Sequence, residues 1–283
     1  MKSGDETLSR SSFGVRALPT LVYGVVADSF GEPVAGLSVS LPDAGLFAVT
    51  DADGGYSFGF GHGSAPPAGH VKMVLNPGRK NPAYGSVERW LTLGAAQLNH
   101  VDPAHVPILN ADVPFQHLVG GLPAVVLAGG DLVLDLSGAT LEFPDLRPEG
   151  NIHAQFAGAA QVPVPSLSGS APLFAYDIQP PGVAVHGVAA LSITPPRLFG
   201  SLDYLPPQGG YVLLTGIDPR SLQLHPIGVA QWTLGKLHSR GPLALERLDY
   251  IGVRPLNGPL QDKLAQYATG ALTLDQLTRS LQP

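Results

Sequence analysis

The chain has 283 residues, 44% of them hydrophobic and only 13% charged, so it can bury a sizeable core and is unlike a disordered chain. Its net charge of −6, without any basic run, argues against nucleic acid or an anionic lipid surface as a partner. The absence of cysteine excludes disulfides, thiolate metal sites and cysteine nucleophiles. The 35 glycines and 28 prolines disfavour long helices and favour short strands joined by turns.

The N-terminal residues 1–18 are polar, and we expect them to form a flexible arm. They lack the apolar core that a signal peptide requires. The most apolar window, residues 118–130, is too short and too interrupted by glycine and proline to cross a bilayer. We therefore expect neither a signal peptide nor a membrane span.

Short segments with alternating apolar residues follow between residues 19 and 112. In the segment 56–60, for example, Tyr56, Phe58 and Phe60 fall on one face, as in a strand that buries one side. The spacing of these segments predicts a β-sandwich. The expected strands cover residues 20–28, 37–41, 47–50, 56–60, 70–75, 88–93 and 106–109.

Four elements of this region occur in a distinctive order. They are a G-x-V strand at 24–26, the turn GEPVAG at 31–36, an alternating strand at 37–41 and the run TDADGGYSF at 50–58. This order resembles the carboxypeptidase regulatory-like domains over about a third of the chain. The resemblance implies a transthyretin-like sandwich for residues 19–112.

A second series of apolar segments extends over residues 113–258, and their spacing predicts a second β-sandwich domain. Three of its motifs, at 179–182, 206–209 and 218–228, loosely resemble a β module of large bacterial surface and Rhs-type proteins. The expected strands cover residues 124–128, 131–136, 139–143, 151–157, 173–178, 190–194, 211–217, 224–232 and 244–253.

The last residues, 259–283, change to helical periodicity. A helix is expected over 259–268, and a second over 273–282, where Thr273 and Gln276 have the spacing of a capping box. The sequence therefore predicts an all-β fold of two consecutive β-sandwich domains with a short C-terminal helical segment.

The two helices carry apolar stripes that they cannot bury fully against each other. We predict that these stripes bind another protein chain, and the alternative is that the helix pair docks on the β body of its own chain. The binding residues would be Leu260, Leu264, Tyr267, Leu274, Leu277 and Leu281.

The turn Asp51-Ala52-Asp53-Gly54 is similar to the start of a calcium loop, but Gly55 and His62 occupy two positions where that loop needs acidic ligands. We therefore interpret it as a hairpin turn.

Pairs of histidines raise the alternative of a metal site. His62 and His70 flank one loop, and His100 and His105 flank Asp102, but neither pair has a complete ligand set nearby. We expect no bound metal and no cofactor.

The sequence contains no recognisable nucleophile–base pair, no G-x-S-x-G or H-E-x-x-H motif and no phosphate-binding glycine loop. We expect no catalytic residue and therefore a non-enzymatic protein, with an enzyme whose site is unrecognised as the alternative. Several aromatic side chains could form a surface that binds a glycan or a protein, and the alternative is that they pack in the core or at a sheet edge. They are Trp90, Trp232, Tyr84, Tyr204, Tyr211 and Tyr250.

These expectations favour a structural, adhesive or assembly component of an extracellular or cell-surface multiprotein structure, such as a fibre or appendage. Its partners would be proteins, either copies of itself in a homo-oligomer or a larger assembly, joined through sheet edges. The alternative is a component of a phage tail, an injection machine or an Rhs-type toxin particle that assembles in the cytoplasm.

Overall fold

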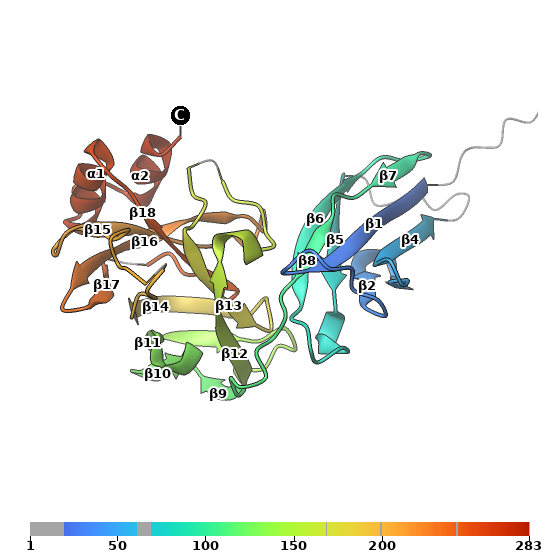
Figure 1. Cartoon of the computed structure of the whole chain (residues 1–283), viewed down its shortest axis with the longest axis horizontal. Coiled ribbons are helices and arrows are strands. Elements are labelled where there is room, and N and C mark those ends of the chain that lie inside the picture. Colours follow the sequence, from blue (N-terminus) through green and yellow to red (C-terminus); the bar gives the residue numbers. More distant parts are fainter. Residues whose placement is uncertain (1–19, 61–68, 168, 199, 242, 283) are drawn as a thin grey trace, which may run out of the picture.

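The computed structural model describes residues 20–60, 69–167, 169–198, 200–241 and 243–282, and the chain is mainly β (Figure 1). An N-terminal unit of two small sheets is followed by a ten-stranded sheet and two short helices. The prediction of a mainly β fold with a C-terminal helical segment is confirmed. The first 18 residues, expected to be an arm, lie outside the described residues.

The N-terminal unit has two four-stranded sheets whose inward side chains form one core. In the first sheet, β1 pairs antiparallel with β4 and parallel with β7 and β8. In the second, the order is β3-β2-β5-β6, with antiparallel pairing throughout. The strands are β1 (Thr20–Asp28), β2 (Ser38–Leu41), β3 (Leu46–Val49), β4 (Gly55–Phe60), β5 (Gly69–Leu75), β6 (Val87–Leu93), β7 (Leu98–His100) and β8 (Ala104–Val106).

The turn at residues 50–54 passes the chain from one of these sheets to the other. The Asp51 carboxylate accepts hydrogen bonds from the backbone N–H groups of Asp53 and Gly55, at 3.0 and 2.7 Å. Gly54 has a φ of +75°, and a Cβ there would lie 2.3 Å from the carbonyl oxygen of Val26. Asp51 is thus a turn-forming residue. The turn is not a hairpin as expected, because β3 and β4 belong to different sheets.

The remaining strands form one ten-stranded sheet of order β10-β11-β14-β17-β16-β15-β18-β13-β12-β9. Its strands are β9 (Gln116–Val119), β10 (Val125–Leu127), β11 (Leu132–Glu142), β12 (Glu149–Gly158), β13 (Phe174–Gln179), β14 (Ala184–Ile193), β15 (Tyr211–Ile217), β16 (Leu224–Thr233), β17 (Lys236–Arg240) and β18 (Tyr250–Pro255).

This sheet curls into a nearly closed barrel. The segment 116–127 pairs with β12 through β9 and with β11 through β10, and Gly121 and Leu122 add backbone hydrogen bonds to Leu136. It therefore joins the two ends of the sheet around a single large core. The expected second sandwich, with two separate sheets, is replaced by this one sheet. Register shifts in the long paired strands, such as the one between Asp135 and Gly138, allow the bending that closure requires.

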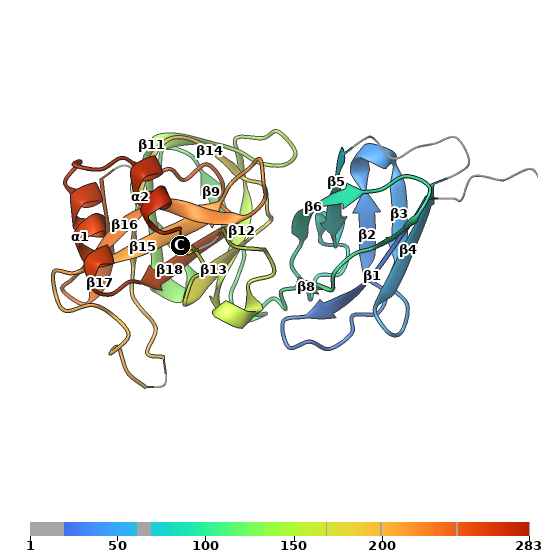
Figure 2. The ribbon, with the colours of Figure 1, turned by 90° about the horizontal axis from the view of Figure 1, so that it is seen from above.

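The two helices, α1 (Pro259–Ala268) and α2 (Leu274–Ser280), lie over β15 and β16 (Figure 2). Thr273 caps α2, and its side chain and that of Gln276 form the expected capping box. No helix in the described part of the chain is both long enough and apolar enough to span a bilayer. Short 3-10 turns occur at Pro42–Ala44, Pro77–Arg79, Ala128–Gly130 and Ala159–Gln161.

Candidate functional site

The N-terminal unit and the barrel meet along a junction that begins next to β6. The backbone N–H of Ser86 donates to the side-chain oxygen of Gln179 at 2.8 Å, and the Gln179 amide donates back to the Ser86 carbonyl at 3.2 Å. Both residues are buried. The side chain of Gln179, at the end of β13, therefore satisfies the backbone N–H and C=O of Ser86 in the other unit, as a neighbouring strand would.

A chain of charges extends this junction. Glu88 forms ion pairs with Lys72 at 2.6 Å and with Arg247 at 3.0 Å, and Arg247 also binds Asp249 at 2.6 Å. The Asp249 carboxylate accepts the backbone N–H of Gly182 as well, at 2.6 Å. Burial raises the pKa of Asp249, although Arg247 opposes that shift. Two cations and two carboxylates thus neutralise one another across the junction.

Asp177 is a second buried carboxyl group at the same place. It accepts a hydrogen bond from the Gln179 amide at 2.7 Å. Tyr250 lies opposite it in the sheet, and among the described residues the buried Tyr250 hydroxyl has no partner at full hydrogen-bond geometry. Burial raises the pKa of Asp177 to about 7, while the Gln179 amide and the nearby Tyr250 hydroxyl oppose the shift and the charge of Asp249 adds to it.

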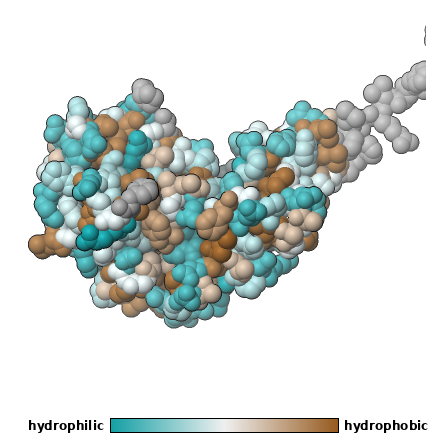
Figure 3. Space-filling model, viewed as in Figure 1, coloured by the Kyte–Doolittle hydropathy of each residue, from teal (hydrophilic) through white to brown (hydrophobic). Residues whose placement is uncertain are grey.

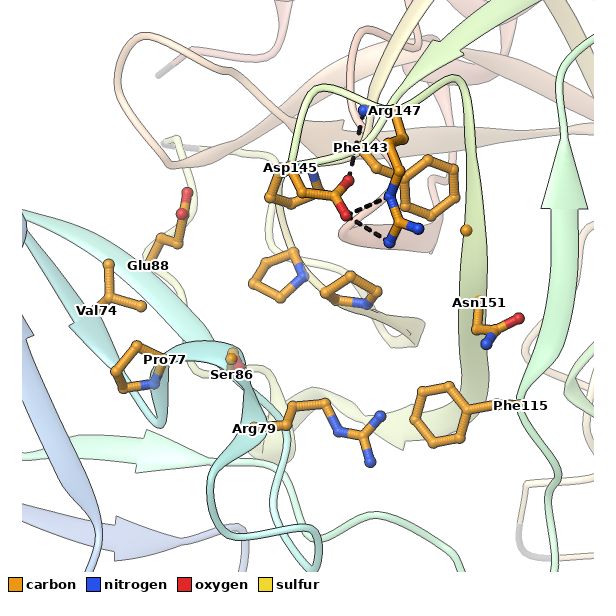
Figure 4. A pocket seen from close by; sticks show the side chains of 15 residues that line it. Val74, Pro77, Arg79, Ser86, Glu88, Phe115, Phe143, Asp145, Arg147 and Asn151 are labelled. Carbon is orange, nitrogen blue, oxygen red and sulfur yellow. Dashed lines mark hydrogen bonds and ion pairs between the residues drawn. The ribbon is translucent and has the colours of Figure 1, made fainter.

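An open cleft of about 610 Å³ lies beside this polar junction (Figure 4). Arg79 and Phe115 lie on one side of it, and Phe143 lies with the ion pair of Asp145 and Arg147 on the opposite side. The Arg147 guanidinium is bound to the Asp145 carboxylate through two nitrogens, at 2.5 and 2.6 Å. Figure 3 shows that the molecule narrows between its two lobes.

Arg79 differs from Arg147 because no carboxylate in the described part of the chain pairs with it. Its guanidinium carbon lies 3.9 Å from the centroid of the Phe115 ring. Its Nε is buried and has no hydrogen-bond partner among the described residues, and desolvation lowers the pKa of Arg79. Neither Arg79 nor Phe115 belongs to a periodic segment or a known motif, so the sequence alone does not point to them.

The C-terminal residues expected to bind another chain make contacts with the barrel of their own chain. Leu264, Tyr267 and Leu277 are buried in a cluster with Leu213 and Val229 of the barrel. The other predicted residues pack against this cluster but stay half-exposed; these are Leu260, Leu274 and Leu281. Contacts within the chain therefore occupy the buried half of the expected surface, and an additional contact with another chain stays a prediction.

The histidines of the alternative metal sites are in separate environments. His62 lies outside the described residues, and the exposed His70 has its Nδ1 3.2 Å from the Thr92 hydroxyl. His105 interacts through Nδ1 with a backbone carbonyl, and His100 packs against the Tyr23 ring. Among the described residues, no three side chains of metal-binding type gather into a site.

The aromatic residues considered for binding are divided between core and surface. Trp232 and Tyr250 are buried in the barrel, whereas Trp90 is 38% exposed on β6. The three other tyrosines are half-buried; these are Tyr84, Tyr204 and Tyr211.

The edge strand β3 is the most exposed apolar strand of the N-terminal unit. Phe47 is 69% and Val49 is 63% exposed. The backbone N–H of Thr50 donates to the carbonyl of Leu37, so Thr50 is hydrogen-bonded to the neighbouring chain segment. In an antiparallel pair the residues alternate between those that bond to the partner strand and those that do not. The backbone N–H and C=O groups of Phe47 and Val49 therefore point away from β2, toward the free edge. The opposite edge of this sheet, β6, faces the junction with the barrel (Figure 2).

No protein-family model matches the sequence, and no curated protein is significantly similar to it. Among solved structures, the chain is similar to a DUF3823 family protein from Bacteroides ovatus, with 12% identity, a TM-score of 0.22, and coverage of 62% of this chain and 90% of that one. It is also similar to the Bacillus anthracis TIE protein, with 7% identity, a TM-score of 0.25 and coverage of 85% of this chain. The match covers only 49% of the TIE protein. Similarity at this level supports no inference about fold or function.

Proposed function

We propose that this chain is a non-enzymatic assembly component of an extracellular or cell-surface protein structure. We further propose that its N-terminal unit is a transthyretin-like sandwich of the carboxypeptidase regulatory-like type. The shared core of its two sheets supports this assignment. So does the position of the Asp51 to Gly54 turn, which links those sheets where the resembled domains carry their T-D-x-x-G motif.

The observation that carries the assembly role is the edge strand β3. Natural edge strands are usually protected by charges, prolines or bulges, yet Leu46–Val49 consists of four apolar residues. One cation is close, since Lys80 Nζ lies 5.9 Å from the Phe47 ring centroid. Because the barrel occupies the β6 side, β3 is the edge at which this sheet can be extended.

We propose that the strand added at β3 is the β3 of a second copy. Antiparallel pairing with Phe47 opposite Val49 of the other copy would bring the outward-facing backbone groups of both strands into register. The same register would pack exposed apolar side chains of the two copies next to each other, and cross-strand contacts of this kind stabilise a sheet. The interface would thus be symmetric, as in most homo-oligomers.

Substitution at the edge tests this proposal. Phe47→Lys places a charge in the interface, and Val49→Pro removes one outward N–H without touching the ladder to β2. We expect both variants to shift the mass measured by light scattering toward the monomer, while the wild-type chain self-associates. Phe30→Lys is the matched control, because Phe30 is 75% exposed but lies in a turn. A monomeric wild-type chain, or an oligomer that survives both edge variants, would contradict the proposal.

A further inference from the structure

We propose that the junction cleft binds a carboxylate that carries an apolar group, with Arg79 as the residue that contacts the carboxylate. This would be a ligand site in addition to the assembly edge. The chemical class of the ligand follows from the charges and the lining of the cleft and from the fixed position of Arg79.

The cleft has one cation whose charge is not compensated within the described residues. Asp145 neutralises Arg147, and the ion pairs of Glu88 neutralise that side of the junction. His153 lies near Arg79, but burial lowers its pKa, so it is uncharged at neutral pH. Arg79 alone remains, and a single negative charge suits it better than the two charges of a phosphate group.

The lining of the cleft is largely apolar, which selects the rest of the ligand. Two phenylalanines and several prolines supply rings and aliphatic surface, and Ser86 and Asn151 add polar groups. The volume of about 610 Å³ is within the usual range of small-molecule sites. A carboxylate attached to an aromatic or aliphatic body would satisfy both the charge and this surface. The apolar residues are Phe115, Phe143, Pro77, Pro144, Pro180 and Pro181.

Arg79 is held in place before any ligand arrives. The side chain of Asn76 donates to the carbonyls of Asn81 and Tyr84, both at 2.8 Å, and accepts the N–H of Asn81 at 2.9 Å. These bonds brace the turn that presents Arg79, whose own φ of +51° is in the left-handed region. A braced arginine loses little freedom when a ligand binds.

A purely structural role for Arg79 leaves its unpaired hydrogen-bond donors unexplained. Stacking on Phe115 uses the face of the guanidinium, whereas its N–H groups point along the edge of that plane. The buried Nε has no acceptor in the described part of the chain, and leaving such a donor unpaired is unfavourable. The terminal nitrogens of Arg79 are not enclosed in this way and also have no acceptor among the described residues, so a carboxylate in the cleft would bind them with its matching planar geometry.

The probe for this site is 3-phenylpropanoate, and its amide, 3-phenylpropanamide, is the uncharged control. Binding is followed by NMR through the Nε–Hε signal of Arg79 and by calorimetry. For a ligand this small we expect a Kd in the range of roughly 1–10 mM, with the amide about tenfold weaker or worse. A peptide source is tested with acetyl-Phe-Glu-amide against acetyl-Phe-Gln-amide. If only the small acid binds, the natural ligand is a free carboxylate and not a side chain.

Three substitutions complete the test. Arg79→Gln should abolish measurable binding of 3-phenylpropanoate, whereas Arg240→Gln, which changes the net charge equally but lies on β17, should not. Asp145→Asn frees Arg147 and should tighten binding several-fold. The wild-type comparison of acid with amide does not depend on how any variant folds. Equal binding of acid and amide, an unmoved Arg79 signal at saturation, or no binding at roughly 10 mM would each overturn the proposal.

Discussion

Asp177 is a carboxyl group that the fold removes from water and places near another carboxylate. Its pKa of about 7 is far above the ordinary aspartate value, so the folded state binds its proton more tightly than the unfolded state does. The stability that this provides is fully present below about pH 4 and is lost as the pH rises through 7. A shift of this size corresponds to a few kcal/mol, on the order of 1.4 per pH unit.

We therefore expect the free energy of unfolding to increase when the pH falls from about 8 to about 5. The Asp177→Asn variant should lose the part of this dependence that Asp177 causes, keep the part that comes from the buried Asp249, and be more stable than the wild type at pH 8. Urea titrations at several pH values measure both effects. Asp203→Asn, at an exposed position, is the control that should keep the wild-type slope. A wild-type stability that rises with pH over this interval would show that Asp177 is ionised in the folded state.

Strand β15 explains why the C-terminal helices lie where they do. Its residues Val212 and Leu214 point into the barrel core, while Leu213 between them points outward into the cluster under the helices. A strand with apolar residues on both faces needs cover on both sides. The helices supply that cover, and for this reason their apolar stripes are largely buried against their own barrel.

This packing predicts the response to two leucine substitutions. Leu264→Ala removes a fully buried side chain from the helix–barrel cluster and should lower the free energy of unfolding by about 2–5 kcal/mol. Leu260→Ala, one turn earlier and half-exposed, should cost clearly less. Chemical denaturation compares the two. Equal and small losses would mean that the helices detach from the barrel in solution, and the predicted contact with another chain would regain support.

The sequence predicts individual elements well where hydrophobic periodicity is strong and uninterrupted. The strands at Thr20–Asp28 and Tyr211–Ile217 and the helix at Pro259–Ala268 coincide with the expected segments. The segments 131–136 and 139–143 form one strand, β11, because a register shift absorbs the polar residues between them. The strands that the sequence does not predict are short or lack alternation, namely β7, β9 and β17, and β8 begins two residues before the expected segment.

Barrel and sandwich cannot be distinguished from alternation alone, because both bury one face of each strand. The outcome depends on register and bulges, which pair residues far apart in the sequence. The junction cleft has the same origin. Arg79 and Phe115 meet only because the two units dock; Arg79 ends a short 3-10 turn and Phe115 lies in a loop, and no local pattern marks a site at either.

At the scale of the whole molecule, Gln179 connects two units that share no sheet. Its side-chain amide accepts a hydrogen bond from the N–H of Ser86 and donates one to the C=O of Ser86, which is 93 residues away in sequence. The same amide also donates a hydrogen bond to the carboxyl group of Asp177. The contact between the two units and the buried carboxyl group therefore share one side chain. Removing it would leave buried polar groups on both sides without partners.

We expect Gln179→Ala to lower the stability of the junction by about 1–3 kcal/mol and to weaken the cooperation between the units. In calorimetry, the N-terminal unit should then melt at a lower temperature than the barrel, and the amide of Ser86 should exchange with solvent much faster. Gln231→Ala removes a comparable side-chain bond, from Gln231 to the Gly209 carbonyl at 2.9 Å, but within the barrel. It should leave the Ser86 amide protected. If the Ser86 amide stays protected in Gln179→Ala as well, the charged chain through Glu88 and Arg247 holds the units together, and the glutamine is dispensable.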